Sequence, residues 1–259
     1  MKTEFGESWR RTFYSAIRDS LNLDEKSDLR SRDLLYSLLK DSDYGLQLAN
    51  ISSVLDGNDS IIFGAGPSIE SDIEGLLHFI SRKHPVIVAA DGAAEALLTR
   101  GIRPDIVVSD LDSCSVETLK LCSKSGCVFV HAHGDNADLM KAIVPQISSN
   151  RVGTTQVASR DPVHNFGGFT DGDRACFVAG SFNPSRLIIA GMDFGSDEGR
   201  FSVNRYSNAR NPKRPLKLEW GKKSLEFLIS NARKTRFQNV TKLGLEINGA
   251  PKVEYREIN

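Results

Sequence analysis

Short apolar runs alternate with helical segments along most of this chain, and that alternation restricts the fold more than any other feature. The runs are rich in Val and Ile, and each is followed within a few residues by glycine or aspartate. They occupy residues 61–63, 85–90, 105–109, 127–131 and 186–190, with helical patterns at 69–81, 93–99, 116–123 and 137–144. Parallel strands need crossover connections, which place helices on the faces of the sheet. We therefore predict a Rossmann-like α/β fold, with a mostly parallel sheet and helices on both faces.

The pattern loosens after Arg151 but does not end. A strand at 152–159 leads to a glycine-rich turn at 165–170, and a helix follows at 171–179. Beyond the strand at 186–190, a helix is expected at 218–232 and a late strand near 240–243.

Residues 1–57 differ in character from the rest. Leucines at 34, 35, 38 and 39, followed by Leu46, Ile51, Val54 and Leu55, recur at helical spacing, and Gly57-Asn58 ends the pattern in the manner of a helix C-cap. We predict a helical N-terminal subdomain at 1–57 and an α/β catalytic domain at 58–259. The helices have no catalytic motif, so we expect them to pack on the main domain or on a second copy in a homo-oligomer.

Composition excludes several classes of function. The 33 Lys and Arg residues balance 33 Asp and Glu residues, so net charge gives no sign of a nucleic-acid partner or an anionic membrane. No apolar run is long enough to span a membrane, which favours a cytoplasmic protein. The cysteines form no CxxC pair, so neither a zinc site nor a disulfide framework is indicated.

Asp110 and Asp112 follow the β-branched run at 105–109. Residues i and i+2 of an extended segment point to the same side, so the two carboxylates should face one target. Adjacent carboxylates repel unless a proton or a cation lies between them, and oxygen ligands favour Mg²⁺ with bound phosphates. The alternative is an acidic turn that caps the next helix through Ser113 or Ser115.

Further acids fall at or just beyond the ends of neighbouring strands: Asp91, Asp135 and Asp138. The carboxyl ends of parallel strands share one edge of the sheet, where ligands bind in such folds. A cluster of acids there favours a divalent metal with bound phosphate. Asn136 lies at the same edge, as does His133, which precedes Gly134 and should lie on the loop. His131 is better explained as a packed strand residue.

The Gly64-Ala65-Gly66-Pro67-Ser68 turn follows a strand and opens a helix, an arrangement that can hold an anion. A dinucleotide fingerprint would need a third glycine where Ile69 stands, which makes an NAD-type site a poor fit.

Basic residues gather at 200–217: Arg200, Arg205, Arg210, Lys213, Arg214 and Lys217. One interpretation is a solvated surface. The other is a lid that closes positive charge onto a triphosphate.

Taken together, these motifs resemble the archaeal 6-hydroxymethyl-7,8-dihydropterin pyrophosphokinase family, which is related to the thiamine pyrophosphokinases. The resemblance covers about residues 60–200 and rests on the segments at 64–68, 90–93, 104–112, 131–136, 154–156, 165–174 and 191–195. Ala137 replaces a threonine of the thiamine enzymes and Phe169 replaces an arginine, while Gly172-Asp173 departs from their Asp-His pair. These departures argue against thiamine as the substrate.

The resemblance implies transfer of the β,γ-diphosphate of ATP to the pterin hydroxymethyl group, with release of AMP. It implies Mg²⁺ at Asp110, Asp112 and Asp135, with Asp91 and Asp138 as further ligands or supporting acids. The implied nucleotide and phosphate contacts are Gly64, Gly66, Pro67, Ser68, His133, Gly134, Asn136, Thr154, Thr155, Gln156, Arg205 and Arg210. The implied pterin contacts are Gly167, Gly168, Asp171, Asp173 and Asp193.

Two other functions stay open at this stage. A nucleotide-sugar transferase, of the type associated with flagellin glycosylation, would use the same carboxylates and metal. A non-catalytic nucleotide-binding protein would bind ATP without turnover. The sequence also leaves open whether the product feeds a folate or a methanopterin-type cofactor.

Overall fold

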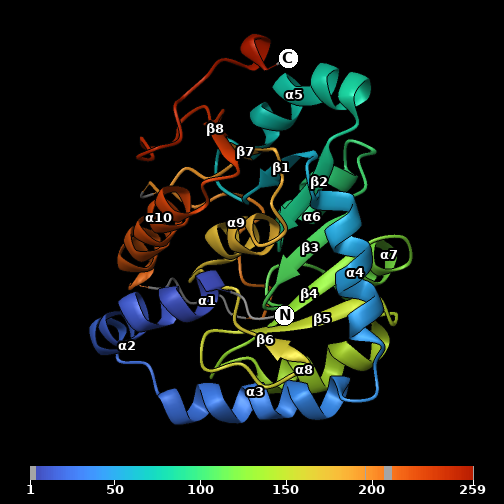
Figure 1. Cartoon of the computed structure of the whole chain (residues 1–259), viewed down its shortest axis with the longest axis vertical. Coiled ribbons are helices and arrows are strands. Elements are labelled where there is room, and N and C mark those ends of the chain that lie inside the picture. The colour runs from blue at the N-terminus through green and yellow to red at the C-terminus, as the bar shows by residue number, and fades with distance from the viewer. Residues whose placement is uncertain (1–3, 196, 207–211, 259) are drawn as a thin grey trace.

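The computed structural model describes residues 4–195, 197–206 and 212–258, and these form one parallel eight-stranded sheet (Figure 1). The strand order is β6-β5-β4-β3-β2-β1-β7-β8, and every pairing is parallel. The strands are β1 (Asp59–Phe63), β2 (Val86–Ala90), β3 (Ile106–Ser109), β4 (Cys127–Ala132), β5 (Arg151–Thr155), β6 (Val163–His164), β7 (Arg186–Ala190) and β8 (Arg236–Asn239). The predicted α/β fold is confirmed.

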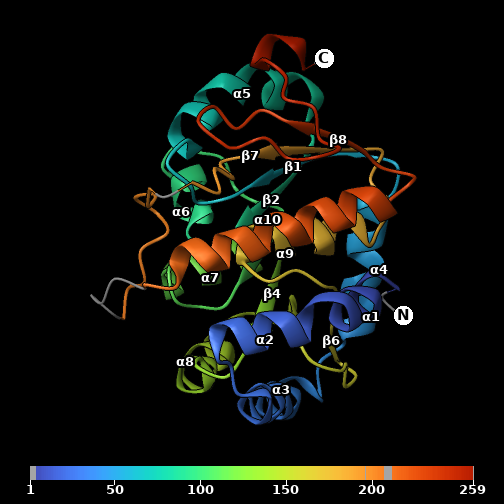
Figure 2. The ribbon, with the colours of Figure 1, turned by 90° about the vertical axis from the view of Figure 1, so that its left-hand side faces the viewer.

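Helices cover both faces of the sheet because the strands are apolar on both sides. Ile61 and Phe63 of β1 belong to one hydrophobic cluster, whereas Ile62 between them belongs to the other. The first cluster includes the crossover helices α5 (Ile69–Lys83), α6 (Ala93–Leu98), α7 (Val116–Ser123) and α8 (Ala137–Ile143), and the one-turn helix η2 (Val144–Gln146) continues α8. On the other face, α9 (Asp171–Gly180) lies against β1, β2 and β3, and α10 (Arg214–Asn231) packs on α9 (Figure 2).

The N-terminal helices pack on the main domain. They are α1 (Glu4–Trp9), the π-helical turn η1 (Arg10–Tyr14), α2 (Ser15–Leu21), α3 (Glu25–Leu39) and α4 (Tyr44–Leu55). Helix α3 contacts β4, β5, β6 and α8, and Trp9 donates from Nε1 to Ser224 Oγ on α10 at 2.9 Å. Residues of these helices enter both hydrophobic clusters, and the division between 1–57 and 58–259 stays a prediction.

The C-terminal segment differs slightly from expectation. The last strand is β8, a few residues earlier than the apolar stretch at 240–243, because Phe237 is buried in register beside β7. The chain then crosses α5 and ends in the short helix η3 (Tyr255–Glu257). Within the described ranges, no helix has the length and hydrophobicity that crossing a bilayer requires.

The parallel topology brings the predicted site residues to one edge. The strands β1, β2, β3, β4 and β7 end immediately before Gly64, Asp91, Asp110, His133 and Gly191, respectively. All these strands run in one direction, so the loops that follow them line the same crevice.

Candidate active site

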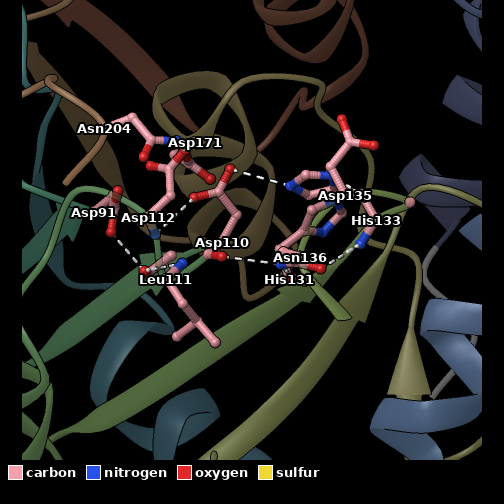
Figure 3. A network of polar contacts seen from close by, with 12 residues as sticks. Asp91, Asp110, Leu111, Asp112, His131, His133, Asp135, Asn136, Asp171 and Asn204 are labelled. Carbon is pink, nitrogen blue, oxygen red and sulfur yellow. Dashed lines mark hydrogen bonds and ion pairs between the residues drawn. The ribbon is translucent and has the colours of Figure 1, made fainter. Parts of the chain in front are cut away.

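The turn after β3 presents the two predicted carboxylates to this crevice. Leu111 has a φ of 77°, a left-handed conformation that is costly for a residue with a branched side chain. Its amide donates to Ser109 Oγ at 2.8 Å, and its side chain is fully buried in the core. The turn therefore anchors Leu111 and leaves Asp110 and Asp112 on the crevice side (Figure 3). Helix α7 is capped separately, by the side chain of Ser115.

Asp91 is held rigidly beside this turn. It too is left-handed, with a φ of 44°, and its carboxylate accepts from Ser109 Oγ at 2.5 Å, Ser113 N at 2.9 Å and Cys114 N at 3.2 Å. Three hydrogen bonds fix this carboxyl group in a buried position, where its charged form is disfavoured.

A third acid comes from α9, which lies on the opposite face of the sheet from α5. Asp171 begins α9, and one carboxylate oxygen from each of Asp91, Asp110 and Asp171 lies within 4.8 Å of the others. Burial, followed by the charge of Asp110, raises the pKa of Asp171 to about 7. Burial also raises the pKa of Asp91 well above its ordinary value, with the charges of Asp110, Asp171 and Asp112 adding to the effect. Without a cation, burial and like-charge repulsion therefore favour the protonated forms of Asp91 and Asp171.

Asp110 is the acid that holds its charge. Burial raises its pKa, but the His133 hydrogen bond and the charges of His133, Lys217 and Arg174 outweigh burial, and the pKa lies below the ordinary value. His133 Nε2 is 3.3 Å from Asp110 Oδ2. Arg174 lies nearby, with Nη1 2.7 Å from Asp171 Oδ1. The basic side chains of His133, Arg174 and Lys217 therefore lie close to the acidic cluster.

The donor set fits a divalent cation such as Mg²⁺. The three clustered side chains supply carboxylate oxygens, the ligands that Mg²⁺ prefers. The raised pKa values of Asp91 and Asp171 show the unfavourable charging that a cation would relieve. Asp112 lies beside them: it accepts from Asn204 Nδ2 and Ser113 Oγ, both at 2.7 Å, and burial raises its pKa. Asp110 belongs both to the predicted metal set and to the observed cluster.

Two cavities meet at the acidic cluster. The first, of about 210 Å³, is walled by the glycine-rich loops at 64–67 and 191–195, with Asp91, Asp112 and Phe201. The second, of about 410 Å³, is lined by His133, Gly134, Gln156, Arg174 and Lys213 and by residues 21–24, 27 and 28 of the N-terminal segment. Asp110, Thr170, Asp171 and Lys217 line both cavities. The shared wall is therefore the place where two ligands would meet.

Residues 64–67 line the first cavity, but the amides of Gly64, Gly66 and Ser68 have partners within the protein. Gly64 N donates to Ala190 O and Gly66 N to Gly191 O, both at 2.8 Å. Ser68 N and Oγ both donate to the Asp193 carboxylate, at 3.1 and 2.5 Å. Asp193 thus caps the N-terminus of α5. The backbone of the loop, which includes Pro67, forms one wall of the cavity.

Several predicted contact residues in and after β4 and β5 tie strand ends together and line neither cavity. Asn136 donates to Asp110 O at 2.9 Å and to His131 O at 2.7 Å, which ties the ends of β3 and β4 together. His131 Nδ1 lies 2.9 Å from Thr154 Oγ1, and burial lowers its pKa, as expected for a packed strand histidine. Thr155 is buried beside it.

The other two predicted acids lie apart from the cluster. Asp135 is exposed on the loop that follows β4, and its carboxylate points away from Asp110 (Figure 3). The Asp138 side chain is 98% exposed on α8 and pairs with Lys141.

The glycine-rich turn before α9 packs closely against that helix and shapes its first turn. A Cβ on Gly168 would lie 2.4 Å from Arg174 Cα, and one on Gly167 would lie 2.5 Å from Phe177 Cδ1. Both glycines have positive φ angles. Asp173 completes a capping box with Thr170 at the start of α9. The turn therefore positions Asp171 and Arg174.

Arg205 forms its hydrogen bond and its ion pair outside the two cavities. Its Nε donates to Ser113 O at 2.7 Å, and its guanidinium pairs with Glu95. Arg210 lies outside the described residues. The lid interpretation of the basic stretch stays a prediction.

Sequence reasoning missed two residues on the wall that the cavities share, Thr170 and Lys217, and two that line the second cavity, Asp28 and Arg174. Lys217 appeared only as one member of a basic run, although its place on the inner side of α10 brings it to the acids. Asp28 had no local signal, because its partners in the crevice, Gly134 and Gln156, lie more than 100 residues away in the chain.

Comparison with known proteins identifies the family. A family model described as "6-hydroxymethylpterin diphosphokinase MptE-like" matches residues 36–199. Three relatives are named 6-hydroxymethyl-7,8-dihydropterin pyrophosphokinase. The one from Methanocaldococcus jannaschii is 41% identical over 191 residues, covering 71% of this chain and 78% of the relative.

The other two relatives match over more of the chain. The Methanothermobacter thermautotrophicus protein is 36% identical over 227 residues, covering 86% of this chain and 94% of its own. The Pyrococcus furiosus protein is 34% identical over 232 residues, covering 88% and 95%.

Among solved structures, the MAf glycosyltransferase from Magnetospirillum magneticum AMB-1 matches 82% of this chain and 38% of its own, with 18% identity and a TM-score of 0.45. A score this low bears on neither fold nor function. The family model and the three sequence relatives agree with one another and with the motifs. The chain therefore belongs to the 6-hydroxymethylpterin diphosphokinase MptE-like family.

Proposed function

We propose that this protein transfers the β,γ-diphosphate of ATP to the hydroxymethyl group of 6-hydroxymethyl-7,8-dihydropterin and releases AMP. Family membership supports the predicted enzyme class, a diphosphotransferase. The observation that carries the proposal is the acidic cluster at the junction of two cavities, with Lys217 on the wall that both cavities share. Diphosphate transfer needs this arrangement, because donor and acceptor must meet beside a concentration of compensating charge.

The two cavities differ in chemistry, and we assign the substrates accordingly. The glycine-walled cavity offers flat backbone surfaces and the carboxylates of Asp193 and Asp197, which suits a planar pterin whose aminopyrimidine edge donates hydrogen bonds. The other cavity contains Arg174, Lys213 and Lys217, which suits the phosphates of ATP. The hydroxymethyl group would then lie at the shared wall, beside Asp110 and Asp171.

In this arrangement the hydroxymethyl oxygen attacks the β-phosphorus and loses its proton to solvent, the bond from that phosphorus to the bridging oxygen of the α-phosphate breaks, and AMP leaves. Arg174 and Lys217 bind and orient the phosphate oxygens, while His133 holds Asp110 in place through its Nε2 contact. Asp91, Asp110 and Asp171 would hold Mg²⁺, with Asp112 in support. When bound, the ion supplies positive charge against the phosphate oxygens.

The assay is an incubation with ATP, Mg²⁺ and 6-hydroxymethyl-7,8-dihydropterin, followed by separation of the nucleotides. We expect AMP that depends on the pterin, without ADP. Parallel incubations contain thiamine, no acceptor, or CMP- and UDP-sugars in place of ATP. Turnover of a nucleotide sugar without pterin-dependent AMP would replace this proposal with a glycosyl transfer, and ATP binding without any turnover would indicate a non-catalytic protein.

A further inference from the structure

The N-terminal helices contribute a buried carboxylate to the second cavity. Asp28, in the first turn of α3, is 3% exposed and accepts three hydrogen bonds. Oδ1 accepts from Gly134 N at 2.8 Å, and Oδ2 accepts from Tyr14 Oη at 2.6 Å and Gln156 Nε2 at 2.7 Å. Burying a carboxylate against neutral donors is costly, so the contacts must compensate for its desolvation.

Two of the three partners belong to the crevice. Gly134 is on the loop after β4, and Gln156 directly follows β5. Asp28 therefore joins α3 to the ends of two strands that are remote from it in sequence. Both partners and Asp28 itself line the cavity that also contains Asp110, Arg174 and Lys217.

Close packing at Gly134 provides a second, independent sign of the same connection. A Cβ built on Gly134 would lie 3.0 Å from Ser27 Cβ and 3.4 Å from Asp28 Oδ1. The loop thus approaches the first turn of α3 so closely that a methyl group on Gly134 would require a shift of a few tenths of an ångström. The residue before Gly134 is His133, whose ring contacts Asp110. The contacts form a continuous path from α3 to the acidic cluster.

We propose that Asp28 is a positioning residue for diphosphate transfer: by holding Gly134 and Gln156, it sets the wall of the second cavity and the place of the His133 ring against Asp110. This inference rests on the proposed function. It gives the N-terminal helices a part in positioning the site, although they contain no catalytic motif.

The test compares Asp28→Ala, Asp28→Asn and Tyr14→Phe in the full-length protein. Alanine removes the acceptors for both Gly134 and Gln156. Asparagine keeps an oxygen toward Gly134 and places an NH2 group toward Gln156, whose side-chain amide can turn so that its oxygen accepts. Tyr14→Phe removes a hydrogen bond from the same carboxylate on the side away from Gly134, and so serves as the control for lost stability. We expect kcat to fall at least about tenfold in Asp28→Ala, with most activity kept in Asp28→Asn and in Tyr14→Phe.

Hydrogen exchange at the Gly134 amide gives a readout that does not depend on turnover. It should be accelerated in Asp28→Ala and unchanged in Tyr14→Phe. If the wild-type protein shows no diphosphate transfer, the proposed function fails while the exchange result still tests the contact. If folded Asp28→Ala matches Tyr14→Phe in kcat within twofold, the positioning role is wrong.

A second variant covers the case in which Asp28→Ala does not fold. Gly134→Ala leaves Asp28 intact but requires the loop and the first turn of α3 to separate by a few tenths of an ångström. Its kcat should also fall several-fold, because the same wall moves. Wild-type kcat in folded Gly134→Ala would overturn the proposal.

Discussion

Nε2 of His133 lies 3.3 Å from Oδ2 of Asp110, so the loop after β4 holds the principal carboxylate of the loop after β3. The contact keeps Asp110 charged while its neighbours Asp91 and Asp171 have raised pKa values. Asp110 is therefore charged before a cation binds, whereas the charged forms of Asp91 and Asp171 would be stabilised most by the bound cation.

Replacing Asp110 by asparagine should abolish most turnover. The substitution keeps the shape of the side chain but removes the charge that we assign to Mg²⁺ binding. We expect kcat to fall at least about 100-fold. The thermal unfolding midpoint should fall modestly, because His133, Lys217 and Arg174 stabilise the charged form of Asp110 in the folded protein. Asp56→Asn, at the exposed C-cap of α4, is the matched control and should retain wild-type kcat. Wild-type kcat in Asp110→Asn would remove Asp110 from the site.

Lys217 should prove essential although sequence reasoning gave it no role of its own. It lines both cavities beside Asp110 and Asp171. We expect Lys217→Ala to lower kcat by about 10²- to 10³-fold, measured at saturating ATP and pterin. Lys223→Ala removes a lysine from the same helix, where it pairs with Glu219 at 2.6 Å on the surface, and should change kcat less than twofold. Equal activities in the two variants would contradict the assignment.

Stability should fall with rising pH when no Mg²⁺ is present. The pKa of Asp171 is about 7 in the folded protein, above the ordinary value of 3.8. Between these values the folded state holds a proton that the unfolded chain has lost, so the free energy of unfolding decreases as pH rises through that window. Asp171→Asn should flatten this decrease, and so should added Mg²⁺. Thermal unfolding from pH 4 to pH 8 measures the effect, and an equally steep decrease in Asp171→Asn would assign it to another group.

Gly168→Ala should destabilise the fold. Gly168 has a φ of 86°, and a Cβ there would lie 2.4 Å from Arg174 Cα. We expect a loss of about 2–4 kcal/mol in the free energy of unfolding, from backbone strain and overlap together. Gly45→Ala is the control, because a Cβ on Gly45 meets nothing within 4 Å. Denaturant unfolding of both variants checks the prediction, and equal midpoints would show that the turn adapts.

The parts of this structure that the sequence could predict are those with a local cause. Val and Ile runs specify strands, and parallel strands place Asp91 and Asp110 at one edge whatever the details of packing. Asp138 was included in that set because it follows β4, but its position on α8 directs it to solvent. Helix phase, rather than distance along the chain, decides which side such a residue faces.

The remainder depends on how distant segments pack. Asp171 reaches the cluster only because α9 crosses back over β1, β2 and β3 on the opposite face from α5. Lys217 and Asp28 reach it because α10 packs on α9 and α3 packs on the strand ends. None of these crossings is encoded in a local pattern, so Lys217 and Asp28 could not be assigned to the site from sequence alone. Asp171 was assigned to it only through the family resemblance, as a pterin contact rather than as a member of the acidic cluster.

The most direct test of the account follows the phosphorus atoms of ATP labelled at the β-position, with Mg²⁺ and 6-hydroxymethyl-7,8-dihydropterin. Attack at the β-phosphorus predicts that the label appears in the pterin diphosphate and that the released AMP carries none. Label retained in ADP, or in any other nucleotide product, would show that a different bond is broken and would contradict diphosphate transfer at this site.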